Sequence, residues 1–161
     1  MRDVTDRPAA SLNNRFAVAT FETWDGLQKA LDELVDSGSA SQVFSCLGLP
    51  HVFESRPRAL SDKLRSDREL KFASSPQSVC CTSGPLADCL MSRLNAGATT
   101  LGGALGHWLI PRHAADIQRA VLAGQIVVWV QLFDSTDERR AYDALLANSS
   151  RSVGVHDLVR D

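Results

Sequence analysis

Residues 83–111 read SGPLADCLMSRLNAGATTLGGALGHWLIP and separate two halves of the chain that share one pattern. Leucines recur along this stretch at helical spacing, and small residues recur at every fourth position beside them. We therefore expect one long helix that ends at Pro111 and packs closely against a neighbour, although glycines are also able to break a helix. The candidate packing or interface residues are Ala98, Gly102, Leu105, Gly106 and Trp108.

Before this stretch, the chain predicts a strand, a helix and a second strand. Residues 16–21, FAVATF, are a run of strand-forming residues. Residues 24–37 then place apolar side chains at helical spacing, and Gly38 suits the left-handed position that ends a helix. Residues 42–49, QVFSCLGL, predict a strand that ends at Pro50, because proline cannot donate to a sheet ladder.

After this stretch, the same order of elements repeats. Residues 125–132, QIVVWVQL, form the strongest strand pattern in the chain. Ser135 or Thr136 is expected to cap a helix that runs through Leu146, and residues 152–159 predict a last strand. The two halves together predict a duplicated β-α-β pattern.

A duplicated β-α-β pattern predicts a ferredoxin-like α+β fold, in which a four-stranded antiparallel sheet carries two helices on one face. We expect residues 1–14 to be a disordered tail and residues 15–161 to form a single domain, with a helical insertion at about 50–124. The second face of the sheet needs a cover, supplied either by the insertion or by a second copy of the chain. A homodimer is expected from that uncovered face and from the apolar stripe of residues 83–111.

The insertion divides into segments of different character. Residues 54–71 carry many charges of both signs and predict a short surface helix after Pro57. Residues 73–83 are rich in serine and cysteine and predict a loop. The last segment, residues 112–123, predicts a helix that ends at Gly124.

Composition argues against several classes of protein. The chain has 17 Lys and Arg against 19 Asp and Glu, a net charge of −2 and a pI near 6.1, so it lacks the basic footprint of a nucleic-acid-binding protein. The first residues lack the apolar core of a secretory signal, so we expect a cytoplasmic protein. The uncharged run 94–111 is diluted by polar residues and glycines, so membrane association is expected to be weak at most.

Several short motifs follow one another in the second part of the chain. They are Gly84-Pro85-Leu86-Ala87, Gly102-Gly103-Ala104-Leu105-Gly106, Ile110-Pro111, Ala114-Ala115, Gly124 and Ile126–Val130. In this combination the chain resembles a group of small bacterial general stress proteins, heat- or cold-induced by name and mostly of unknown function. The resemblance implies two β-α-β halves around a Gly/Ala-rich insert and an association with stress. It implies neither catalytic residues nor a cofactor.

The four cysteines raise the question of metal binding. Cys80, Cys81 and Cys89 would suit a soft metal together with His107 or His51, because thiolates and imidazoles are ligands of zinc and copper. Their spacing matches no recognised metal site, and a chain without an export signal favours reduced thiols over disulfides. We expect no metal and free thiols.

The pair Cys46 and His51 suggests a nucleophile and a base, although a cysteine inside a strand is more often buried and unreactive. One hypothesis is therefore a small-molecule-binding or catalytic ferredoxin-like dimer with a pocket between the sheet and the insertion. We prefer a non-enzymatic stress-associated protein that needs no cofactor and acts through self-association or a protein partner. The candidate pocket residues are Cys46, His51, Trp108 and Trp129.

Overall fold

The computed structural model describes residues 13–36, 44–58, 67–73, 78–82, 85–106, 109, 111–149 and 154–159. Strands and helices alternate irregularly along these residues, as in an α+β protein. In chain order the elements are β1 (Asn13–Phe21), α2 (Trp24–Asp36), β2 (Phe44–Gly48), α3 (Pro50–Glu54), β3 (Asp67–Lys71), β4 (Ser78–Thr82), α5 (Pro85–Asn95), α6 (Leu101–Leu105), α7 (Pro111–Leu122), β5 (Ile126–Leu132), α8 (Ser135–Asn148) and β6 (Gly154–Val159).

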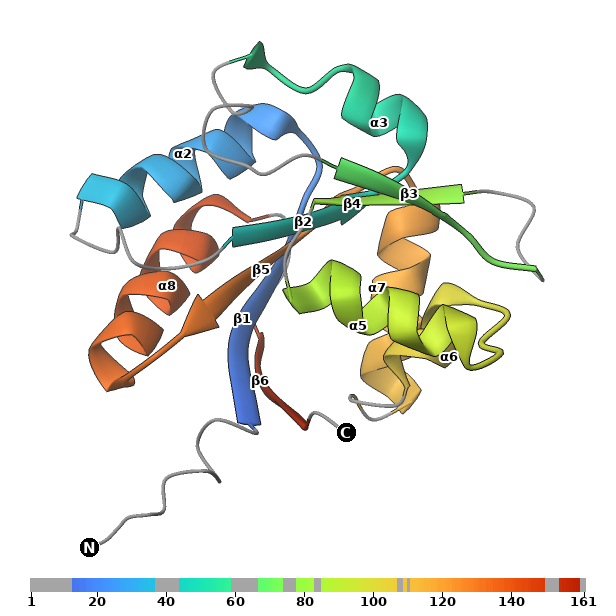
Figure 1. Ribbon diagram of the computed structural model, residues 1–161. Coiled ribbons are helices and arrows are strands. Elements are labelled where there is room, and N and C mark those ends of the chain that lie inside the picture. Colours follow the sequence, from blue (N-terminus) through green and yellow to red (C-terminus); the bar gives the residue numbers. More distant parts are fainter. Residues whose placement is uncertain are drawn as a thin grey trace, which may run out of the picture.

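The described strands lie in one sheet with the order β3-β4-β2-β5-β1-β6, and every neighbouring pair is antiparallel (Figure 1). The two strand–helix–strand halves are confirmed, and their strands interleave. β1 lies between β5 and β6, while β2 lies on the other side of β5. β1 and β2 therefore run in the same direction, as the helical connection between them requires.

Within the described residues the sheet has six strands rather than the four expected, because the insertion contributes β3 and β4. The predictions of a charged surface helix and of a following loop were wrong at these two strands. In β3 only Leu70 is buried. The charged residues of this strand give the same sequence pattern as the solvent-exposed face of a helix. In β4, Cys80 and Cys81 are buried and behave as small apolar residues. Arg58, directly after Pro57, is helical as expected, and residues 59–66 lie outside the described residues.

Both faces of the sheet are covered by helices of the same chain. α2 and α8 pack side by side on one face, and α5, α6 and α7 cover the other (Figure 1). Alternate residues of β1 contribute to the two cores: Ala17 and Ala19 face α2 and α8, whereas Phe16 and Val18 face the insertion. The insertion therefore covers the sheet of its own chain. Of the two covers that the sequence left open, the structure shows the insertion, so no uncovered face among the described residues argues for a homodimer.

Residues 83–111 contain two helices rather than one. α5 ends at Asn95, and Gly97 then adopts a φ of 105°, a conformation that is costly for any residue with a Cβ. α6 begins after Thr100, whose side-chain oxygen accepts the N–H of Gly103 at 2.9 Å. The glycine breaks the helix, and a new cap starts the next one.

The other boundaries lie within a few residues of those expected. The helix α7 ends before Gly124, which has a φ of 89°. The helix α8 is capped by Asp134 rather than by Ser135 or Thr136, so that part of the prediction was wrong. β1 begins at Asn13, so the last two residues of the expected tail belong to the sheet. The rest of that tail, residues 1–12, lies outside the described residues.

Candidate functional site

The outer side of helix α8 combines large apolar side chains with charges of both signs. Ala141, Ala144 and Leu145 are buried in the core between α8, α2 and the sheet. Tyr142 and Leu146 instead keep 41% and 46% of their surface exposed. We define the α8 flank as Ser135, Glu138, Arg139, Tyr142, Asp143 and Leu146.

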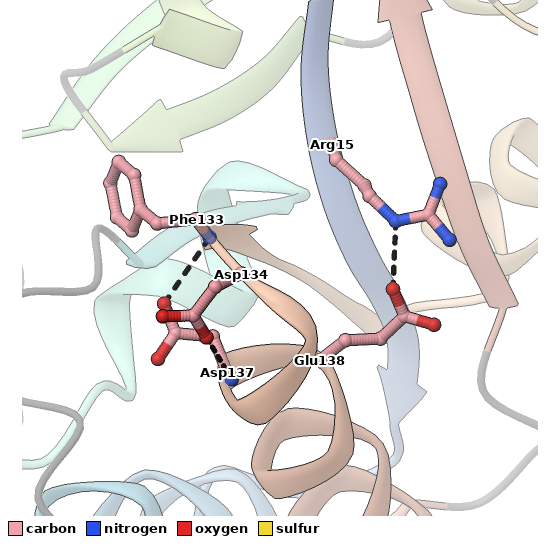
Figure 2. Close-up of polar contacts among 5 residues, drawn as sticks. All are labelled: Arg15, Phe133, Asp134, Asp137 and Glu138. Carbon is pink, nitrogen blue, oxygen red and sulfur yellow. Dashed lines mark hydrogen bonds and ion pairs between the residues drawn. The ribbon is translucent and has the colours of Figure 1, made fainter. Parts of the chain in front are cut away.

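Two carboxylates fix the beginning of α8 (Figure 2). The Asp134 carboxylate accepts the backbone N–H of Asp137 at 2.8 Å, and the Asp137 carboxylate accepts the N–H of Phe133 at 3.2 Å. Each bond satisfies a donor that would otherwise lack a partner at the helix start. The first turn of the α8 flank is therefore held in one orientation.

An ion pair then joins α8 to the first strand of the sheet. Glu138 Oε1 lies 2.8 Å from Nε of Arg15, which is on β1 (Figure 2). The two side chains are 44% and 36% exposed, so the pair contributes at most about 1 kcal/mol. Residues four apart share one side of a helix, so Tyr142 and Leu146 follow Glu138 along the side that reaches β1.

The opposite side of α8 is occupied by α2. Near the end of α8, the side-chain amide of Asn148 donates to Glu33 Oε1 of α2 at 3.2 Å. With α2 on that side, the α8 flank is directed toward the β1–β6 end of the sheet.

The α8 flank is hollowed by a shallow groove of about 420 Å³. Arg139 and Asp143 carry opposite charges one turn apart, and neither takes part in an ion pair within the described part of the chain. The groove thus presents a phenol, a cation and an anion beside an exposed leucine. It is lined by Ser135, Glu138, Arg139, Tyr142 and Asp143.

The structure does not bring the candidate pocket residues together. Trp129 belongs to the core under the insertion, whereas Cys46 belongs to the core under α2 and α8, so the sheet separates them. His51 is exposed on the short helix α3. Trp108 lies outside the described residues.

Cys46, Cys80 and Cys81 are buried, and Cys80 and Cys81 lie in a strand rather than in the expected loop. Burial raises the pKa of Cys46 to about 12, an effect that the charge of Arg56 partly opposes. Burial, and then the carboxylates of Asp67 and Glu69, raise the pKa of Cys80 to about 11. Thiols with raised pKa values are largely protonated at neutral pH and are weak nucleophiles.

Two further features of the described residues bear on the site. Among the described residues, there is no group of three or more His, Cys, Asp or Glu side chains that could hold a metal ion. None of the described helices has both the length and the apolar character needed to cross a membrane.

The small-residue stripe packs within the chain at Gly102. Its N–H donates to Oε1 of Gln118 on α7 at 2.6 Å, and a Cβ at this position would lie 3.0 Å from the same oxygen. Leu105 is fully buried in the core, and Gly106 ends α6. Ala98 is partly buried, packs against the same core and lines a second shallow groove of about 570 Å³.

The α8 flank is not among the sites predicted from the sequence, although one signal for it was present. Leu145 and Leu146 are adjacent, and neighbouring residues of a helix point about 100° apart, so both cannot face the same core. One leucine had to be exposed. The position of the helix on the sheet decides which of the two leucines is exposed.

No protein-family model matches this chain, and comparisons with curated proteins and with solved structures gave no match.

Proposed function

We propose that this chain is a non-enzymatic, stress-associated protein that acts by forming a homodimer through the α8 flank. The observation that carries this proposal is the exposure of Tyr142 and Leu146, one helical turn apart, on the side of α8 not covered by α2. Single exposed apolar residues are common on protein surfaces. Two together, beside an arginine, are typical of the centre of an interface, where tyrosine and arginine are enriched.

The charges of the α8 flank support a second copy as the partner. A twofold axis that passes near Tyr142 and is perpendicular to α8 makes the α8 helices of the two protomers antiparallel. Arg139 of one protomer then lies near Asp143 of its partner, and the pairing occurs twice because the interface is symmetric. Complementary charges of this kind fix orientation and disfavour other partners.

Light scattering at micromolar concentration tests the homodimer. We expect a mass twice that of the 17.5 kDa chain for the wild type. Leu146→Glu places a charge in the apolar centre of the interface and should give monomer. Leu122→Glu is the matched control, because Leu122 is 43% exposed, much like Leu146, but lies on α7. A wild-type monomer, or equal effects of the two variants, contradicts the proposal.

The stress association is supported by the motifs that resemble bacterial general stress proteins, which run from about residue 84 to residue 130. Its test is the amount of the protein before and after a heat or cold shift in the organism that encodes it. We expect a rise after at least one of these shifts. Constant amounts under both would remove this part of the proposal.

The strand order also supports a ferredoxin-like description of the fold. The strands of the two halves have the order β6-β1-β5-β2, and their helices α2 and α8 share one face of the sheet. In this description, β3, β4, α5, α6 and α7 are an elaboration inserted between the halves. An experimental structure with a different order of these four strands would reject it.

The groove at Ala98 favours a second candidate function, the binding of a small apolar molecule. Phe72 and Leu94 line this groove, and Lys71 places a cation at its rim. An apolar carboxylate would match both features. Binding of 1-anilinonaphthalene-8-sulfonate should then weaken in Ala98→Glu and persist in Leu146→Glu. Equal binding by both variants would exclude this groove as the site.

A further inference from the structure

We infer that two copies of the chain join through the outer edges of their β6 strands, so that the two sheets become one continuous antiparallel sheet. This edge pairing rests on the proposed homodimer and specifies its geometry. The proposed homodimer specifies only which surface of each copy is in contact. The edge pairing also specifies how the second copy is oriented relative to the first.

The two edges of the sheet differ in their protection against pairing. At one edge β3 reads DRELK, in which four of five residues are charged. Charged edge strands are a common protection against unwanted strand pairing. At the other edge β6 reads GVHDLV, and Asp157 is its one Asp, Glu, Lys or Arg residue. Among the described strands, the edge at β3 is thus protected by its charges, whereas the edge at β6 is open to pairing.

The open edge and the α8 flank lie at the same end of the sheet. Among the described strands, β6 pairs with β1 alone, so its outer edge has no described neighbour. Arg15 of β1 is in register with Asp157 of β6 and forms the ion pair with Glu138 of α8. One residue therefore links the position of the open edge to that of the α8 flank.

Symmetry brings both features into a single interface. Two β6 strands that pair antiparallel are related by a twofold axis perpendicular to the sheet. Such an axis keeps both α8 helices on the same face, with their flanks directed toward each other above the paired β6 strands. Tyr142 and Leu146 of the two protomers then face each other, and Arg139 of one protomer is directed toward Asp143 of its partner. Strand addition provides backbone hydrogen bonds, and the α8 flank provides side-chain contacts.

Hydrogen exchange of the full-length wild type, measured by NMR over a dilution series, tests the edge pairing. In an antiparallel ladder, every second N–H of an edge strand points away from its neighbour. These outward amides of β6 should exchange about tenfold more slowly when the concentration is about 100 times the dissociation constant. The amides of β3 are the internal control, and their exchange should not depend on concentration.

The outcomes distinguish a failure of the edge pairing from a failure of the proposed homodimer. A dimer by mass whose β6 amides do not respond to concentration overturns the edge pairing and leaves the homodimer intact. A monomer at every concentration overturns both. Protection that rises with concentration in β6 and is lost in Leu146→Glu supports both.

A proline pair provides a second test that does not depend on amide assignments. Of the neighbours Val155 and His156, one directs its N–H toward β1 and the other directs it outward. Of Val155→Pro and His156→Pro, one should lose the β1 ladder and unfold. The other should keep a wild-type circular dichroism spectrum and become monomeric. If the folded variant remains a dimer, the β6 edge is not the interface.

Discussion

The thiol of Cys46 lies on β2 beneath the α2–α8 layer, and none of its surface reaches solvent. Its ionised form would be buried in apolar surroundings, so the folded chain holds its proton more tightly than the unfolded chain does. This difference makes the stability of the fold depend on alkaline pH.

We expect the free energy of unfolding to fall as the pH rises above 9. Below that value Cys46 is protonated in both states, and its contribution is fully present. Above it the unfolded chain releases the proton, whereas the folded chain retains it until about pH 12. The loss attributable to Cys46 is about 1.4 kcal/mol per pH unit in this window.

Urea unfolding at pH 8 and pH 10 measures this loss. Cys46→Ala is the control, because it removes the titrating group and keeps a small apolar side chain. Its stability should fall less steeply with pH than that of the wild type. Equal slopes would show that the buried thiol is not responsible.

At the scale of the element, the start of α8 depends on one carboxylate. Asp134→Ala removes the cap of the Asp137 N–H and should lower the free energy of unfolding by about 1 kcal/mol. Ser135→Ala is the matched control, because Ser135 lies one residue inside the helix and should have little effect. The urea concentrations at which the two variants are half unfolded show whether Asp134 or Ser135 caps the helix. A larger loss for Ser135→Ala would place the cap one residue later.

The elements of the two outer halves could be predicted because their patterns are local. β5 is apolar along almost its whole length, and α2 buries residues at helical spacing, among them Leu27, Leu31 and Leu34. These patterns follow from burial in a central strand and against a sheet, and both are visible in a short window of sequence.

The strands of the insertion could not be predicted in the same way. β3 has a single buried residue, Leu70, and becomes a strand because it pairs with β4 and covers the end of the sheet. β4 in turn pairs with β2, where Leu47 is opposite Cys81. Such pairing is tertiary context, which overrides the weak local preference of short polar segments.

The α8 flank could not be predicted from the sequence for a related reason. Tyr142 and Leu146 resemble core residues when α8 is considered alone. Their exposure results from the positions of α2 and β1, which hold the helix through Asn148 and Glu138. The helical spacing of apolar residues predicts how wide the apolar face of a helix is. It does not predict which edge of that face is buried against the sheet and which is left exposed.

At the scale of the whole molecule, the proposed homodimer predicts a charge-swap result. Arg139→Asp places acids opposite acids across the twofold axis and should raise the dissociation constant by about tenfold or more. Adding Asp143→Arg restores opposite charges, so the double variant should return toward wild-type affinity. Sedimentation equilibrium of the two variants measures this. If the double variant is no tighter than Arg139→Asp, the two residues do not face each other.

The position of β1 in the sheet has a consequence for synthesis of the chain. β1 is made first but pairs with β5 and β6, the last two strands, for example where Arg15 is in register with Leu132. On the ribosome, the centre of the sheet must therefore wait until nearly the whole chain has emerged. Meanwhile β3 and β4, which are close in sequence, are able to pair early. Long-range closure of this kind slows folding, and the nascent chain exposes its apolar first strand until its partners arrive.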